Sequence, residues 1–156
     1  MTTETMSRRT FMFRSASLLV SVSSFSFLTN ACNNNASQTA ALKINSGKAY
    51  LNLDDPAYRT LHSSGNGVKI TIGKAIKPII VTRVNDNEVA AFSSSCTHAG
   101  YNVLLPQKGI LTCESGHGGS YDIRGNVLSP PPTSNLDKFN AVLQSKKIII
   151  DLNNYI

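Results

Sequence analysis

Two cysteine–histidine pairs stand close together in the second half of the chain. One residue separates Cys96 from His98, three separate Cys113 from His117, and fourteen lie between His98 and Cys113. Thiolates and imidazoles are soft and borderline ligands that suit iron–sulfur, zinc and copper centres. They are also the ligand set of a [2Fe–2S] centre in which His replaces Cys on one iron. These four side chains are therefore the candidate metal ligands.

The residues around both pairs extend the pattern. Gly100 follows the first pair, Gly118 follows the second, and Tyr121–Asp122 and the proline run Ser129–Pro132 come next. With these neighbours the segment resembles the cluster-binding region of the Rieske iron–sulfur family, whose pattern is Cys-X-His followed by Cys-X-X-His. The similarity runs from about Lys69 to the C-terminus.

The resemblance implies one [2Fe–2S] cluster per chain, with the thiolates of Cys96 and Cys113 on one iron and the imidazoles of His98 and His117 on the other. Because neutral imidazoles lower the negative charge of the cluster, Rieske potentials run from about −150 to +300 mV, against about −400 mV for plant-type ferredoxins. The expected function is one-electron transfer, as a carrier or a subunit of a redox complex. The sequence offers no second metal site or nucleophile–base pair for a complete enzyme.

One departure from the family pattern falls within the second pair. Three residues separate Cys113 from His117 where the family has two, while Tyr121 keeps its place when counted from His117. A one-residue insertion explains both facts, and Gly116 allows the loop to bulge because glycine accepts backbone angles that other residues avoid. Two alternatives stay open: a structural zinc module with the same ligands, and a Rieske-like fold that has lost its cluster.

Hydrogen bonds to the sulfurs tune such a cluster. In high-potential members of the family a Ser two residues after the second His, and a Tyr two residues further on, donate these bonds. Tyr121 matches the tyrosine, but Gly119 stands at the serine position and Ser120 lies one place along. The resemblance therefore implies a midpoint potential between the extremes, below that of quinol-oxidising members.

The chain has three cysteines, and Cys32 is the one outside the two pairs. No cysteine pair remains for a structural disulfide. Rieske proteins of cytochrome bc complexes usually carry two further cysteines, in the region where this chain has Tyr101 and Ser115. Their absence argues against a quinol-oxidising role, and packing and hydrogen bonds must hold the ligand loops together.

The first 32 residues read as an export signal and not as part of the fold. Ser7–Met12 contains Arg8-Arg9 and resembles a twin-arginine motif, and the uncharged, serine-diluted apolar stretch Ser15–Leu28 follows it. That route exports folded proteins, which suits a cofactor assembled before export, whereas ring-hydroxylating dioxygenase ferredoxins work in the cytoplasm and need no signal. Ala31-Cys32 resembles a lipoprotein cleavage site, with lipidation at Cys32, although cleavage without a lipid and a retained N-terminal anchor remain open.

These features predict a protein in the periplasm or on the periplasmic face of the cytoplasmic membrane. Residues 33–41 are polar and uncharged and read as a flexible tether. The expected partner is a c-type cytochrome or an oxidoreductase subunit such as a molybdenum oxidase.

The folded domain is expected at residues 42–156, with its cluster-binding part at about 93–133. Short runs rich in β-branched residues alternate with turn signals, and no stretch past Lys43 has helical periodicity, which predicts an all-β fold. The predicted strands are Ala49–Leu53, Val68–Ile72, Pro78–Val84, Val89–Phe92, Gly109–Thr112, Tyr121–Ile123, Val127–Leu128 and Lys147–Leu152. The resemblance implies a Rieske-like antiparallel sandwich or barrel with a small cluster-binding subdomain.

The charge distribution argues against nucleic-acid binding. The formal net charge is +6, and three arginines and one glutamate in the first 32 residues leave +4 for the rest of the chain. No basic cluster with interleaved aromatic residues appears. The remaining histidine, His62, is interpreted as a surface or hydrogen-bonded residue and not as a ligand.

Overall fold

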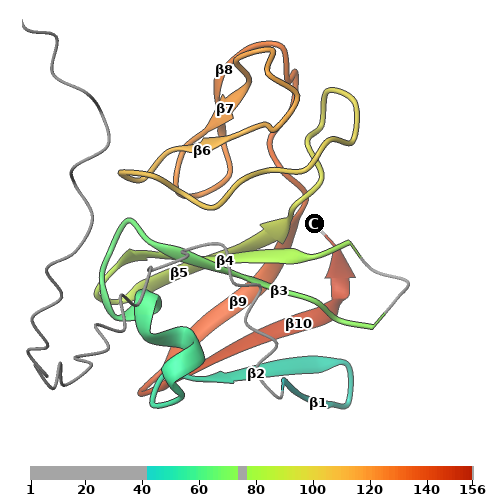
Figure 1. Cartoon of the computed structure of the whole chain (residues 1–156). Helices are drawn as coiled ribbons and strands as arrows, with labels where there is room; N and C mark the ends of the chain where they lie inside the picture. The colour runs from blue at the N-terminus through green and yellow to red at the C-terminus, as the bar shows by residue number, and fades with distance from the viewer. Residues whose placement is uncertain (1–41, 74–76, 156) are drawn as a thin grey trace, which may run out of the picture. The chain divides into compact units, whose positions relative to one another are not determined.

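A computed structural model describes residues 42–73 and 77–155 of the chain, and these residues form two antiparallel sheets (Figure 1). The predicted export signal at 1–32, the lipidation candidate Cys32 and the tether at 33–41 lie outside this part. The described part has no helix with the length and apolar character needed to cross a membrane. The predicted all-β fold class is confirmed.

The larger sheet has seven strands in the spatial order β1-β2-β10-β9-β5-β4-β3. Its strands are β1 (Lys43–Asn45), β2 (Lys48–Asn52), β3 (Gly67–Ile70), β4 (Ile79–Asn85), β5 (Glu88–Ser93), β9 (Lys138–Gln144) and β10 (Lys147–Tyr155). The sheet curls around one hydrophobic core, which receives side chains from β2, β3, β4, β5, β9 and β10.

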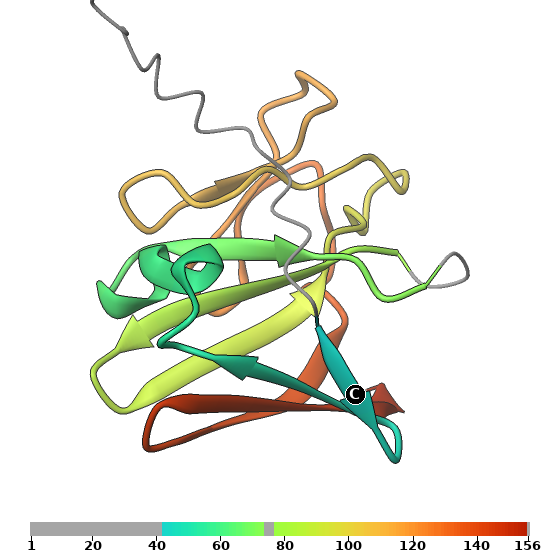
Figure 2. The same cartoon turned by 60° about the horizontal axis from the view of Figure 1, so that its bottom comes forward.

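The smaller sheet has three very short strands in the order β6-β7-β8. They are β6 (Leu111–Thr112), β7 (Ser120–Tyr121) and β8 (Val127–Ser129). In both views this sheet and its loops lie over β4 and β5, on the side away from β2 and β10 (Figures 1 and 2). It carries the segment in which the candidate ligands occur.

Strand β4 has both faces buried, and its side chains alternate between two cores. Ile79 and Val81 belong to the core inside the curled sheet, whereas Ile80 belongs to a second core beneath the smaller sheet. Successive side chains of a strand point to opposite faces, so a continuous apolar run fits a strand that is covered on both sides. In β5, Ala91 and Phe92 divide in the same way between the two cores.

The ligand-bearing segment is an insertion between two neighbouring strands of the larger sheet. The chain leaves the sheet at the end of β5 and returns at β9, and these strands pair with Ala91 opposite Phe139. Just beyond that pairing, the N–H of Ser93 donates to the carbonyl of Asp137 over 2.8 Å. Both ends of the segment are therefore fixed by the same sheet.

The short helix of the fold was not predicted from the sequence. Residues Pro56–His62 form a 3-10 helix, η1, capped by Asp55, whose side chain accepts a hydrogen bond from the N–H of Ala57. An acidic residue followed by proline is a helix-start signal. Tyr58 and Leu61 of η1 are buried in the core of the curled sheet.

Candidate metal centre

The first cysteine–histidine pair lies on a tight loop after β5. The N–H of Cys96 donates to the carbonyl of Tyr101 over 2.7 Å, and the N–H of Gly100 donates back to the carbonyl of Cys96 over 2.8 Å. Gly100 has a φ of 70°, a conformation that favours glycine. The loop buries the thiol of Cys96 and leaves the ring of His98 exposed to solvent.

The second pair lies on the loop between β6 and β7. The N–H of Cys113 donates to the carbonyl of Gly119 over 2.9 Å, which closes the loop at its base. Gly116 has a φ of 74°, so the loop turns through a left-handed residue within the longer spacing between Cys113 and His117. The thiol of Cys113 is buried, and the ring of His117 is exposed.

The four candidate ligands form two like pairs, one of cysteines and one of histidines. The thiols of Cys96 and Cys113 lie within hydrogen-bonding reach of each other, and both cysteines are free of disulfides. The rings of His98 and His117 meet edge to face, with centroids 5.7 Å apart and planes at 67°. Within the described residues no three His, Cys, Asp or Glu side chains surround one point. One pair of thiols and one pair of imidazoles suit a centre with two metals, one for each pair.

The sulfur of Cys96 lies among hydrogen-bond donors. Burial alone would raise the pKa of the Cys96 thiol, but hydrogen bonds from Cys113, Tyr121 and the N–H groups of His98 and Ala99 outweigh it, so that the pKa is lowered. The phenol of Tyr121 donates to this sulfur over 3.4 Å. A site that stabilises a thiolate in this way suits a metal ligand, because the thiolate is the form that binds metal.

The tyrosine hydroxyl is itself held by Thr97, a residue that the sequence analysis did not single out. The N–H of Thr97 donates to the Tyr121 oxygen over 3.1 Å, and the Thr97 hydroxyl lies 3.1 Å from the same oxygen. That hydroxyl also donates to the carbonyl of Ser134 over 2.7 Å. Thr97 therefore connects the tyrosine to the loop that follows the proline run. The position of Thr97 between the candidate ligands Cys96 and His98 was the one feature of the sequence that could have indicated this role.

Gly119 and Ser120, the two other residues considered for sulfur hydrogen bonds, lie against the proline run. A Cβ atom on Gly119 would come within 2.7 Å of Pro132 and 3.2 Å of Pro131, so the prolines occupy the space of a side chain there. The hydroxyl of Ser120 lies 2.7 Å from that of Ser129, which donates to the carbonyl of Gly118. Ser120 therefore contacts β8.

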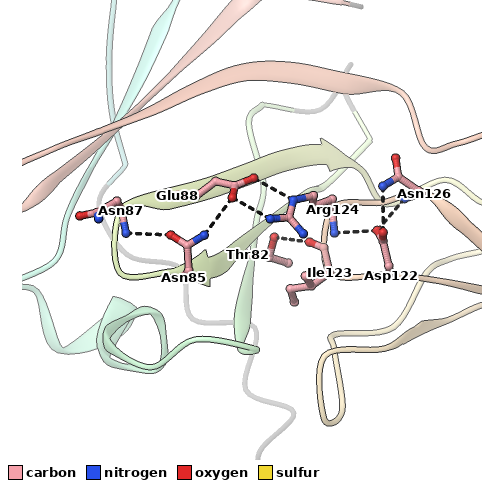
Figure 3. Close-up of polar contacts among 8 residues, drawn as sticks. All are labelled: Thr82, Asn85, Asn87, Glu88, Asp122, Ile123, Arg124 and Asn126. Atoms are coloured by element: carbon pink, nitrogen blue, oxygen red, sulfur yellow. Dashed lines mark hydrogen bonds and ion pairs between the residues drawn. The ribbon is translucent and has the colours of Figure 1, made fainter.

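The hairpin between β7 and β8 is attached to the larger sheet by polar contacts (Figure 3). Arg124 donates two hydrogen bonds to the carboxylate of Glu88 in β5, over 2.8 and 2.9 Å, and Asn85 donates to the same carboxylate. The buried hydroxyl of Thr82 in β4 donates to the carbonyl of Ile123 over 2.8 Å. The exposed ion pair contributes little, because solvent screens it, whereas the Thr82 hydroxyl is buried and needs a hydrogen-bond partner within the protein.

The carboxylate of Asp122 organises the hairpin from within. It accepts hydrogen bonds from the N–H groups of Arg124 and Asn126 and from the side chain of Asn126. Burial alone would raise the pKa of Asp122, but these bonds and the charge of Lys138 lower it below its ordinary value. The hairpin tip then packs on the larger sheet, where a Cβ on Gly125 would meet the ring of Phe92 at 3.1 Å.

The remaining histidine does not join the site. His62 is the last residue of η1, and its ring lies 2.7 Å from the carbonyl of Leu53. The interpretation of His62 as a hydrogen-bonded residue is therefore confirmed.

An antiparallel β domain that presents two thiols and two imidazoles on adjacent loops has the composition of a mixed-ligand iron–sulfur protein. Comparison with known families agrees, because residues 59–140 match the family described as Rieske [2Fe-2S] domain. This match covers more than half of the chain, and the protein belongs to the Rieske family, whose domain binds a [2Fe–2S] cluster and serves electron transfer.

Solved structures share the fold. The plasma membrane Rieske protein PetC3 from Synechocystis PCC 6803 is 25% identical, with a TM-score of 0.50 over 60% of this chain and 93% of that one. The complex of the oxygenase and ferredoxin of carbazole 1,9a-dioxygenase contains a chain that is 21% identical, with a TM-score of 0.50 over 65% of this chain and 92% of that one. A search of curated proteins gave no match.

Proposed function

We propose that Cys96, His98, Cys113 and His117 hold a [2Fe–2S] cluster and that the protein transfers single electrons between redox partners. The observation that carries this proposal is the pairing of the four side chains, with two thiols side by side and two imidazole rings next to each other. When bound, such a cluster accepts and returns one electron at each turn. The cysteines are expected to hold the inner iron, because both thiols are buried.

The two histidines lie where an electron would leave the protein. Both histidines are exposed, so that a partner can approach them directly, whereas both cysteines are buried. Glu114 is the one charged residue among those between Cys96 and His98 and between Cys113 and His117. With one charge among four residues, this composition supports docking by shape more than by charge, which is compatible with a c-type cytochrome or an oxidoreductase subunit.

The sequence signals outside the described residues supply the expected setting. A twin-arginine-like leader at 1–32 and Cys32 as a lipidation candidate favour an exported protein, held at the periplasmic face of the membrane by a lipid or an N-terminal anchor. The tether at 33–41 would give the domain at 42–156 freedom to move between donor and acceptor. The similarity to PetC3, a plasma membrane Rieske protein, is compatible with such a location.

The decisive experiment is to purify the protein under anaerobic conditions and record its visible spectrum and, after reduction with dithionite, its electron paramagnetic resonance. A coloured protein with the rhombic, low-average-g signal of a His-ligated cluster is expected. A colourless protein that binds zinc would instead support a structural zinc module. A folded protein that binds neither metal would mean that the cluster has been lost.

His117 is the ligand that the longer spacing places in question, so it is tested by itself. His117→Ala should abolish the rhombic signal while the fold, followed by circular dichroism, is retained. His62→Ala is the matched control, because that histidine bonds to Leu53 far from the site, and it should leave the signal unchanged. A full signal in His117→Ala would remove this residue from the ligand set.

The midpoint potential tests the surroundings of the cluster. Gly119 supplies no hydroxyl and lies against Pro131 and Pro132, whereas Tyr121 donates to the Cys96 sulfur. With one of the two tuning hydrogen bonds in place, the potential should fall between the extremes of about −150 and +300 mV. A titration that gives a value at the upper end would contradict this expectation.

A further inference from the structure

A two-residue segment, Asn102–Val103, lies between the two ligand loops and is paired with the strand that leads to Cys96. Ser95 and Asn102 form an antiparallel bridge, and the N–H of Val103 donates to the carbonyl of Ser94 over 2.7 Å. These bonds fix the segment at the base of the first ligand loop. Val103 is fully buried in the core beneath the smaller sheet.

The same segment is also paired with the second ligand loop. Val103 and Cys113 form an antiparallel bridge, and the N–H of Glu114 donates to the carbonyl of Asn102 over 2.9 Å. Asn102–Val103 therefore lies between two paired segments. The segment on one side leads to Cys96, and the segment on the other contains Cys113. A shift of this segment moves the two thiols relative to each other.

One side chain of the larger sheet holds this segment. The ammonium group of Lys69, in β3, donates to the side-chain oxygen of Asn102 and to the carbonyl of Val103, each over 2.9 Å. Lys69 is opposite Ile80 in the β3–β4 register, and paired residues share a face, so the lysine stem extends from the face that carries the second core.

The surroundings of Lys69 are those of a partly desolvated charge. The side chain is half-buried, and burial lowers the pKa of its amine, while the carboxylate of Glu114 raises it in part. A charged donor with two oxygen acceptors makes stronger hydrogen bonds than a neutral one. The charged group of Lys69 thus donates its hydrogen bonds to the segment between the ligand loops, although Lys69 itself lies far from these loops in the sequence.

We propose that Lys69 is a positioning residue of the metal centre: it holds Asn102–Val103 so that the two cysteine loops keep their separation, and its charge favours the reduced state. This inference rests on the proposed function for its redox part. Reduction adds one negative charge to the centre, and a nearby cation stabilises that charge more than it stabilises the oxidised state. The holding role requires only the hydrogen bonds and applies without the metal.

The holding role is tested by amide hydrogen exchange in the metal-free full-length protein. Lys69→Met keeps the apolar stem and removes the donor, so the amides of Val103 and Glu114 should exchange about tenfold faster, as expected for the loss of about one charged hydrogen bond. Lys146→Met is the matched control, because it removes a lysine from an exposed ion pair with Asp54 that joins the β9–β10 turn to the segment after β2. Equal exchange at these amides in the two variants would overturn the proposal.

The redox role is tested on the metal-loaded protein by potentiometric titration and by the rate of metal loss to a chelator. Lys69→Met should lower the midpoint potential and speed metal loss, Lys69→Arg should restore both, and Lys69→Gln should restore neither the charge nor the potential. A wild-type protein without a cluster would refute the proposed function, whereas the exchange result would still decide the holding role. The redox role would be refuted if Lys69→Met had the same midpoint potential as the control variant Lys146→Met.

Discussion

The larger sheet and the ligand-bearing segment are stabilised in different ways. Strands of up to nine residues and a core of 14 buried residues hold the curled sheet together. The ligand-bearing segment has strands of two or three residues and shares a core of eight, two of which are the candidate ligands Cys96 and Cys113. The second region therefore depends on contacts with the first for stability that its own strands do not provide.

The largest effect should come from the residue at which the two regions meet. Phe92 is fully buried in the second core, and its ring packs against Gly125 of the β7–β8 hairpin. Phe92→Ala should lower the free energy of unfolding by about 3–5 kcal/mol and also speed metal loss. Urea unfolding and chelator kinetics would measure the two effects.

Leu51→Ala is the control for this experiment. Leu51 is fully buried in the core of the curled sheet, and its truncation should cost about 2–5 kcal/mol of unfolding free energy. Because it does not contact the second core, metal loss from the folded protein should keep the wild-type rate. Equally fast metal loss in both variants would show that the two regions are one cooperative unit.

A smaller effect is expected at Thr82. Thr82→Val preserves the shape of the side chain but leaves the carbonyl of Ile123 without its donor, which should cost about 1–3 kcal/mol. The loss should appear as faster amide exchange in the β7–β8 hairpin, with β10 unchanged. Thr82→Ser retains the hydroxyl and should recover most of the stability. Uniformly faster exchange across both sheets would contradict the division into two regions.

The next effect is on the potential and not on stability. Tyr121→Phe removes the donor to the Cys96 sulfur and should lower the midpoint potential by about 40 mV, the one-electron equivalent of about 1 kcal/mol. Thr97→Val removes the hydroxyl that lies next to the phenol and should shift the potential in the same direction. If Thr97 acts through Tyr121, the double variant should match Tyr121→Phe. Additive shifts would mean that Thr97 acts by another route.

The smallest effect is a pH dependence from Asp122. Its pKa is lowered in the folded protein, so its stabilising contribution is present above the unfolded pKa of about 3.9 and disappears as the pH falls through the folded pKa. Asp122→Asn should therefore be less stable than the wild type at pH 7, and the difference should shrink below about pH 4. Urea unfolding of the metal-free protein between pH 3 and 7 would measure it. A constant difference over this range would exclude the carboxylate as its source.

The sequence alone predicted the all-β class, because short β-branched runs separated by turn signals are a local pattern. It placed β2, β4 and β5 to within about one residue, and it named the four side chains that the structure brings together as two pairs. Strand β9 was not recognised as a separate strand, because the exposed, apolar Val142 interrupts the alternation of inward apolar and outward polar residues. The short helix η1 was not predicted, because seven residues of 3-10 helix are too few to show a helical periodicity.

The contacts around the site could not be read from local patterns. Thr97 and Lys69 act through partners 24 to 37 residues away in the chain, at Tyr121, Ser134, Asn102 and Val103. Such contacts depend on how the loops cross in space, which a single sequence does not reveal. The close approach of the prolines to Gly119 is of the same kind, since it depends on the fold of two distant loops.

The attachment of the ligand-bearing segment has a consequence for protein engineering. Its two ends leave the sheet from β5 and β9, which are antiparallel and hydrogen-bonded neighbours, so they lie about 4.8 Å apart. A turn of a few residues can bridge that separation in place of the whole segment. The curled sheet can thus serve as a scaffold in which the segment between β5 and β9 is replaced. Loops from another electron carrier can be inserted there, and the strand order of the sheet stays the same.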